Sequence, residues 1–78
     1  SYSDMLRDTQ PPRKYFVEGM NACKQDIAYE KARLKAVGSP PPKYSVNPYS
    51  SPHGTAEMWN LWDRGYTQAK MDALPALE

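Results

Sequence analysis

The sequence predicts an all-α protein in which two antiparallel helices are joined by a long proline-rich loop. Two segments repeat apolar residues at helical spacing, most of the prolines lie between these segments, and no stretch alternates apolar and polar residues as a strand would. The 78 residues leave room for one small domain, 1–78, and little space for a large buried pocket.

The first helix is expected over about 12–37, after a flexible arm at 1–12. The arm is polar, lacks a sustained period and ends in a proline pair, which favours an extended backbone. The next segment carries an apolar helix face, which comprises Phe16, Met20, Cys23, Ile27 and Leu34. Gly38 and the three prolines at 40–42 cannot continue the helix, so its body is expected at 13–37.

Residues 38–54 contain five prolines and four serines, so they cannot form a regular helix or a central strand. We expect a loop with polyproline character. Its length exceeds the usual range for a helix–helix connection, and loops this long tend to be functional or disordered. Tyr44 and Tyr49 favour a functional loop, because aromatic rings in such a segment pack back onto the domain or bind a partner.

The second helix is expected over 55–74. Thr55 is a good N-cap, and Glu57 in the first turn complements the helix dipole. Pro75 is expected to end the helix near Leu74. One stripe of this helix carries aromatic and small residues, namely Trp59, Trp62, Tyr66, Ala69 and Ala73.

Each predicted helix contains one interior glycine, Gly19 or Gly65, at a cost of about 1 kcal/mol relative to alanine unless packing compensates. Gly19 lies one turn before Ala22, and Gly65 lies one turn before Ala69. Each helix therefore presents a notch of small residues. We expect the two helices to cross at these notches.

Two helices make a thin core. Trp62 is expected to be buried in it, whereas Trp59 is either a core residue or an exposed anchor for an interface. A homodimer, or folding onto a larger partner, would complete a core of this size.

Three motifs follow one another along the chain: Gly-x-x-Ala at 19–22, Asn-Pro-Tyr at 47–49 and Trp-x-x-Gly-Tyr-x-x-Ala at 62–69. Their order and spacing resemble the ribosome modulation factor family, also called the Rmf/CrpP family, over most of the chain. The resemblance implies a small two-helix protein that contacts RNA and protein of the small ribosomal subunit in bacteria. Family members also occur in phages and plasmids, and one branch has been proposed to phosphorylate a quinolone drug.

The formal net charge of +1 is the sum of a basic first helix and an acidic second one. At the end of the first helix, Lys31, Arg33 and Lys35 either meet RNA phosphate or an acidic protein surface, or they complement the helix dipole. Tyr49 is open to two interpretations as well. It either stacks on an RNA base, or it packs on the helix pair while Asn47 caps a turn.

From the family motifs and the charge pattern we expect a small non-enzymatic binding protein that docks on the bacterial ribosome or ribosomal RNA and modulates translation. The alternative is a phage- or plasmid-encoded protein that binds and inhibits a host protein complex, such as a polymerase or a defence system. The candidate partner-binding residues are Lys31, Arg33, Lys35, Lys43, Tyr44, Asn47, Tyr49, Trp59 and Arg64.

Catalytic residues, metal ligands and cofactors are not expected. His53 is the single histidine, and Cys23 lies on an apolar stripe, where a buried inert thiol is the usual state. The short Gly38 segment lacks the pattern of a phosphate-binding loop. One cysteine cannot form an internal disulfide, and no apolar run is long enough to cross a bilayer, so we expect a cytoplasmic location.

Overall fold

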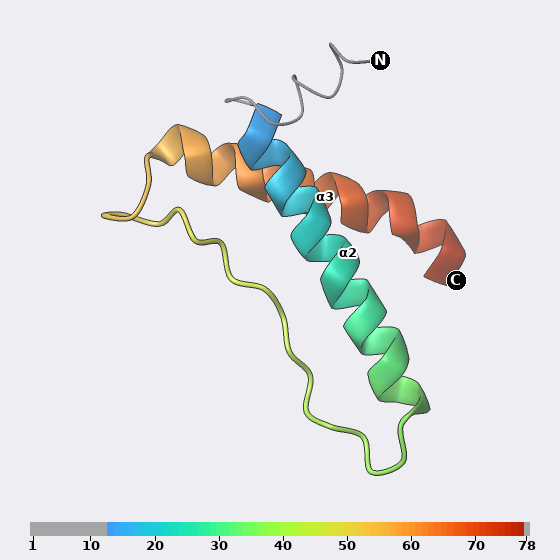
Figure 1. Cartoon of the computed structure of the whole chain (residues 1–78). Helices are drawn as coiled ribbons and strands as arrows, with labels where there is room; N and C mark the ends of the chain where they lie inside the picture. Colours follow the sequence, from blue (N-terminus) through green and yellow to red (C-terminus); the bar gives the residue numbers. More distant parts are fainter. Residues whose placement is uncertain (1–12, 78) are drawn as a thin grey trace.

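The computed structural model describes residues 13–77 and, up to residue 74, their side chains. It contains two α-helices, α2 at Arg13–Lys35 and α3 at Ala56–Leu77, and no strand within the described range (Figure 1). The predicted all-α class with two helices is confirmed. The arm predicted at 1–12 lies outside the described residues.

The helix ends follow local backbone signals. The last turn of α2 tightens where the Ala36 N–H donates to the Arg33 carbonyl at 3.2 Å. Gly38 then takes a φ of 85°, the left-handed conformation that glycine adopts without a steric penalty. At the start of α3, the hydroxyl of Thr55 accepts from the backbone N–H of Met58 at 3.2 Å, so the predicted N-cap is confirmed.

The C-terminal end of α3 differs from the sequence-based expectation. The helix continues through Leu77, so the expected end near Leu74 is wrong. Proline lacks one N–H but holds φ near the helical value. Close to a helix end, Pro75 therefore removes one hydrogen bond without stopping the final turn.

The helices touch through their backbones at the two glycines. A Cβ built on Gly19 would lie 2.0 Å from the carbonyl oxygen of Trp62, and one built on Gly65 would lie 1.9 Å from that of Phe16. Neither position has room for any side chain. The crossing at the two notches is confirmed, and it explains why glycine occupies both helix interiors despite its low helix propensity.

The two helices run in the same general direction, so the antiparallel arrangement expected from the sequence is wrong. Phe16 lies against Gly65, and further along both helices Ile27 and Leu74 line the same hollow. Residue numbers therefore increase together along α2 and α3. Figure 1 shows the C-terminal halves of both helices on the same side of the crossing.

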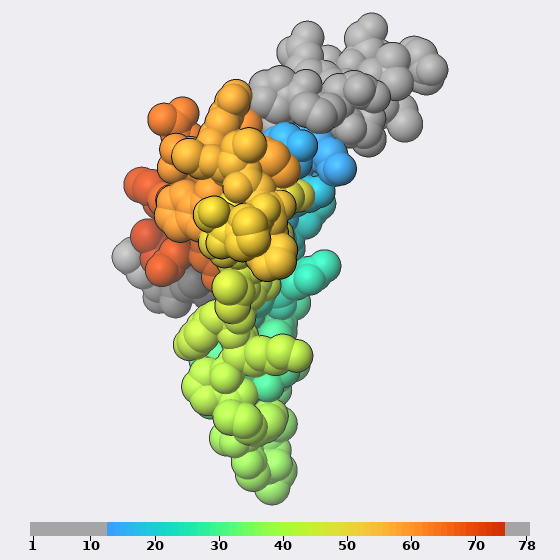
Figure 2. Space-filling model, turned by 90° about the vertical axis from the view of Figure 1, so that its left-hand side faces the viewer, coloured from blue at the N-terminus to red at the C-terminus, as the bar shows by residue number. Residues whose placement is uncertain are grey.

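The physical reason for this direction is the path of the loop. Near the end of α2, the Tyr29 hydroxyl donates to the Pro41 carbonyl at 2.8 Å, and nearer the start of α2, the Tyr49 hydroxyl donates to the Glu18 carboxylate. The loop thus runs back along α2, and Figure 2 shows it lying over one side of this helix. A short turn would have placed α3 antiparallel to α2, whereas the long return brings the start of α3 beside the first half of α2.

The core around the crossing is small. Cys23, Trp62 and Ala69 are the buried hydrophobic residues of the described chain. The Trp62 ring stacks on the Tyr66 ring with 5.3 Å between centroids. The prediction that Trp62 is buried is confirmed, whereas Trp59 remains 38% exposed.

Gly19→Ala should destabilise the fold even though alanine is the better helix former. The new methyl group would meet the Trp62 backbone, which cannot move without separating the helices. Overpacking of this kind costs about 1–3 kcal/mol, more than the propensity gain of about 1 kcal/mol. Urea unfolding followed by circular dichroism measures the change, and the exposed Asn21→Ala serves as the control in the same helix. Equal or higher stability of Gly19→Ala would contradict the close backbone crossing.

Candidate functional site

The side chain of Asp26 joins α2, α3 and the loop. One carboxylate oxygen accepts from the Tyr66 hydroxyl at 2.7 Å and from the Ser45 N–H at 2.9 Å, and the other accepts from the Ser45 hydroxyl at 2.7 Å. Burial alone would raise the pKa of Asp26, but these hydrogen bonds to the charged form outweigh burial and lower the pKa. Burial and the bond to Asp26 raise the pKa of Tyr66. Asp26 therefore serves as a structural anchor held in its charged form.

Asn47 and Tyr49 use their polar groups within the chain. The Asn47 side-chain carbonyl accepts from the Tyr49 N–H at 3.0 Å, which closes a turn, and its amide donates to the Trp59 carbonyl at 3.0 Å. The rings of Tyr49 and Tyr15 form a T-shaped pair with 5.1 Å between centroids. Burial and the hydrogen bond to Glu18 raise the pKa of Tyr49 to about 12. Of the two interpretations that the sequence allows, this geometry favours a turn that packs on the helices.

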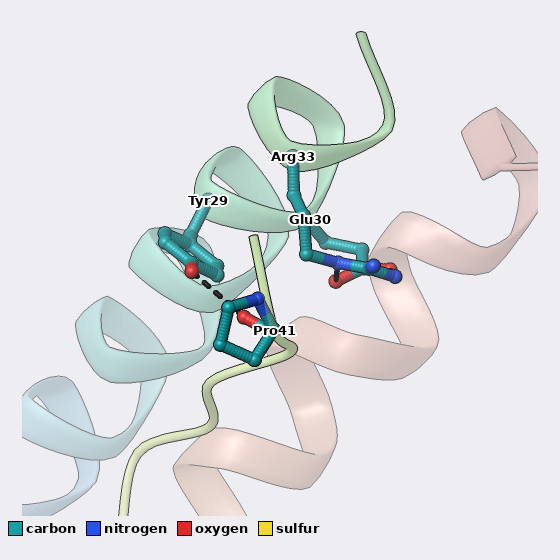
Figure 3. A network of polar contacts seen from close by, with 4 residues as sticks. All are labelled: Tyr29, Glu30, Arg33 and Pro41. Carbon is teal, nitrogen blue, oxygen red and sulfur yellow. Dashed lines mark hydrogen bonds and ion pairs between the residues drawn. The ribbon is translucent and has the colours of Figure 1, made fainter. Parts of the chain in front are cut away.

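Arg33 faces the loop side of α2 and forms hydrogen bonds with a neighbouring side chain. Its guanidinium donates to both carboxylate oxygens of Glu30, one turn earlier, as Figure 3 shows. Hydrogen bonding lowers the pKa of Glu30 and raises that of Arg33. Tyr29 holds Pro41 beside this pair. Arg33 therefore does not share a surface with Lys31 and Lys35, although the three are close in sequence.

A second set of cations forms a stripe on α2, defined by Lys24, Lys31 and Lys35. Their spacings of seven and four residues keep them within about 40° of arc at 3.6 residues per turn. All three are exposed, and none forms an ion pair with a described residue. By the same geometry, the lysine stripe lies on the side of α2 away from the loop.

Lys24 was not among the residues selected from the sequence, although its spacing could have revealed it. A count of cations near the helix end selects 31, 33 and 35, whereas helical periodicity selects 24, 31 and 35. The structure agrees with the second criterion, because Arg33 points to the other side and bonds to Glu30.

The remaining candidates lie apart from the stripe. Lys43 is exposed on the loop, and Tyr44 beside it is 65% exposed. Trp59 lines a hollow at the start of α3 together with Tyr49 and Gly54. Arg64 is exposed on the outer side of α3. The nine candidate residues thus form several separate surfaces.

The described residues show no arrangement for metal binding or nucleophilic chemistry. They contain no cluster of histidine, cysteine and carboxylate side chains that could hold a metal ion. Cys23 is 2% exposed, and burial raises the pKa of its thiol, so the reactive thiolate is disfavoured. Within the same range, neither helix is long and apolar enough to cross a membrane.

Comparisons with known proteins find no match to this chain. No protein-family model, no curated protein and no solved structure matches it.

Asp26→Asn should destabilise the protein at pH 7 by roughly 1.5–3 kcal/mol, because hydrogen bonds to a charged acceptor are lost. The folded pKa of Asp26 is lowered, so its contribution is present above the unfolded pKa near 4 and disappears as the pH falls through the folded value. The stability difference between wild type and variant should therefore shrink below about pH 4.

Urea unfolding at a series of pH values measures this difference. Asp63→Asn is the matched control, because Asp63 is exposed and forms no hydrogen bond or ion pair with a described residue. A difference that stays constant down to pH 2.5 would show that the charge of Asp26 does not stabilise the fold.

Tyr49→Phe should lower the free energy of unfolding by about 1–2 kcal/mol, since the bond to the Glu18 carboxylate is removed while the ring contact with Tyr15 is kept. Tyr44→Phe is the control, because the Tyr44 hydroxyl forms no hydrogen bond with a described residue. Equal effects of the two substitutions would argue against the loop anchor at Tyr49. Chemical unfolding at pH 7 compares them.

Proposed function

We propose that this chain is a small non-enzymatic binding protein that docks on the bacterial ribosome and modulates translation, with the lysine stripe contacting ribosomal RNA. The observation that carries the proposal is the stripe of Lys24, Lys31 and Lys35, which is exposed and free of ion pairs with described residues. The resemblance of the three sequence motifs to the ribosome modulation factor family supports the ribosome as the partner.

The geometry of the stripe suits a polyanion. From Lys24 to Lys35 the helix rises about 16 Å at 1.5 Å per residue, so the three charges are spread along one side of the helix. Lysine contacts to phosphate position a protein on nucleic acid without reading its sequence. The basic end of α2 can therefore provide affinity, while the rest of the surface provides specificity.

The surroundings of the reactive groups support a binding role. The thiol of Cys23 is buried, and the carboxylate of Asp26 accepts three hydrogen bonds from Tyr66 and Ser45. The proposal accordingly assigns no chemical step to the protein.

Replacement of Lys24, Lys31 and Lys35 by glutamine should abolish co-sedimentation with purified bacterial ribosomes. For the wild type, three phosphate contacts predict that affinity falls roughly 20- to 40-fold between 50 and 200 mM salt. The control variant replaces Arg13, Lys14 and Lys70 by glutamine, which changes the net charge equally on other surfaces.

Three outcomes of this experiment would reject the proposal: full binding by the stripe variant, equal loss in the control variant, or salt-independent binding. If the wild type does not sediment with ribosomes at all, the alternative of a phage- or plasmid-encoded protein that inhibits a host protein complex takes precedence. Pull-down from nuclease-treated lysate, with mass spectrometry of the bound proteins, then identifies that complex.

A further inference from the structure

Beyond the crossing, α2 and α3 diverge and leave a groove between their C-terminal halves. Part of this groove is a hollow of about 180 Å³. Its lining residues are Cys23, Ile27, Tyr44, Tyr66, Lys70 and Leu74, together with Asp26 and Glu30. The loop contributes Tyr44, so all three segments of the described fold meet around the hollow.

The open end of the groove is apolar, and no described side chain covers it. Leu34 continues the face of Cys23 and Ile27 but is 68% exposed, because α3 has moved away from α2 at this point. Leu74 is 44% exposed on the opposite side of the groove, and Tyr44 is 65% exposed at its edge. The apolar stripe that the sequence assigned to the core of α2 therefore leaves the core in its last turns.

The charges around the groove select the kind of partner. Its two acidic residues are engaged, since Asp26 accepts from Tyr66 and Ser45 while Glu30 accepts from Arg33. Lys70 is exposed in the lining and forms no ion pair with a described residue. Lys31 lies one turn from both Ile27 and Leu34 and is also unpaired within the described chain. The groove thus offers apolar contacts flanked by two cations that form no ion pair with a described residue.

We propose that this groove binds an acidic amphipathic helix of a partner protein. The hollow is smaller than the roughly 300–1,000 Å³ typical of small-molecule pockets, and its size suits one apolar anchor side chain. An amphipathic helix seated in a groove places such anchors at i, i+3 or i+4, and i+7. Acidic residues beside the anchors would face Lys70 and Lys31. This inference does not depend on the lysine stripe binding RNA.

A pair of fluorescein-labelled synthetic peptides tests the inference. Both peptides carry leucines at i, i+4 and i+7 of a helix, and the flanking positions are glutamate in one and lysine in the other. Fluorescence anisotropy should show that the glutamate peptide binds at least tenfold more tightly than the lysine peptide, because like charges across an interface disfavour binding. Chemical-shift changes on binding should centre on Ile27, Leu34 and Leu74.

Variants distinguish binding in this groove from binding at other exposed apolar residues. The double variant Leu34→Ser, Leu74→Ser should weaken binding of the glutamate peptide more than tenfold. Lys70→Gln should also weaken binding of this peptide, but by a smaller factor than the double variant. Met71→Ser is the matched control, since Met71 is 61% exposed but lines a different hollow beside Arg64. Circular dichroism verifies that each variant is folded.

Four results would overturn the inference: equal affinity for both peptides, no binding of the glutamate peptide, unchanged binding by the double leucine variant, or equal loss in Met71→Ser. Light scattering adds another test. If the wild type is a dimer in solution and the double leucine variant is a monomer, the groove binds a second copy of the chain instead of an acidic helix.

Discussion

Two helix backbones touch directly at Gly19 and Gly65, and this contact determines how the other segments of the chain can pack. At these two positions the carbonyl groups of Trp62 and Phe16 occupy the space that a side chain would need. Close approach lets a small set of buried side chains around Trp62 hold two long helices together. Because the helices meet at one crossing, the parts of α2 and α3 beyond this crossing either make contacts with other segments or stay exposed.

The loop supplies those other contacts. It returns along α2, and Asp26 binds it through Ser45 while also binding α3 through Tyr66. One side of α2 is therefore covered by the loop, and its first half is covered by α3. The second half of α2 keeps two surfaces that no described residue covers, the lysine stripe and the apolar wall of the groove. The surfaces proposed for binding are thus consequences of how few contacts close the fold.

Local features of this fold could be predicted from the sequence because each depends on neighbouring residues. Helical periodicity, the N-cap at Thr55, the stop at Gly38 and the glycine notches all belong to this class. The direction of the second helix could not be predicted. Periodicity defines which face of a helix is apolar, but it carries no information on whether a long loop reverses the chain or returns along the first helix.

The candidate site was harder to predict, because its contacts join residues that are far apart in the sequence. The engagement of Asn47 and Tyr49 depends on residues of both helices, at separations in the chain that no local pattern reports. Arg33 was selected for its charge, yet its pairing with Glu30 on the loop side removes it from the stripe. Lys24 could have been selected, because its spacing from Lys31 is a property of the sequence alone.

The loop returns along α2, and both helices lead away from the glycine crossing in the same direction. Nuclear Overhauser contacts in solution can test this arrangement. The structure predicts contacts from Phe16 to Gly65 and from Ile27 to the Lys70–Leu74 turn of α3. Contacts from Ile27 to the first turns of α3 near Met58, with none to Leu74, would show an antiparallel pair and contradict the account.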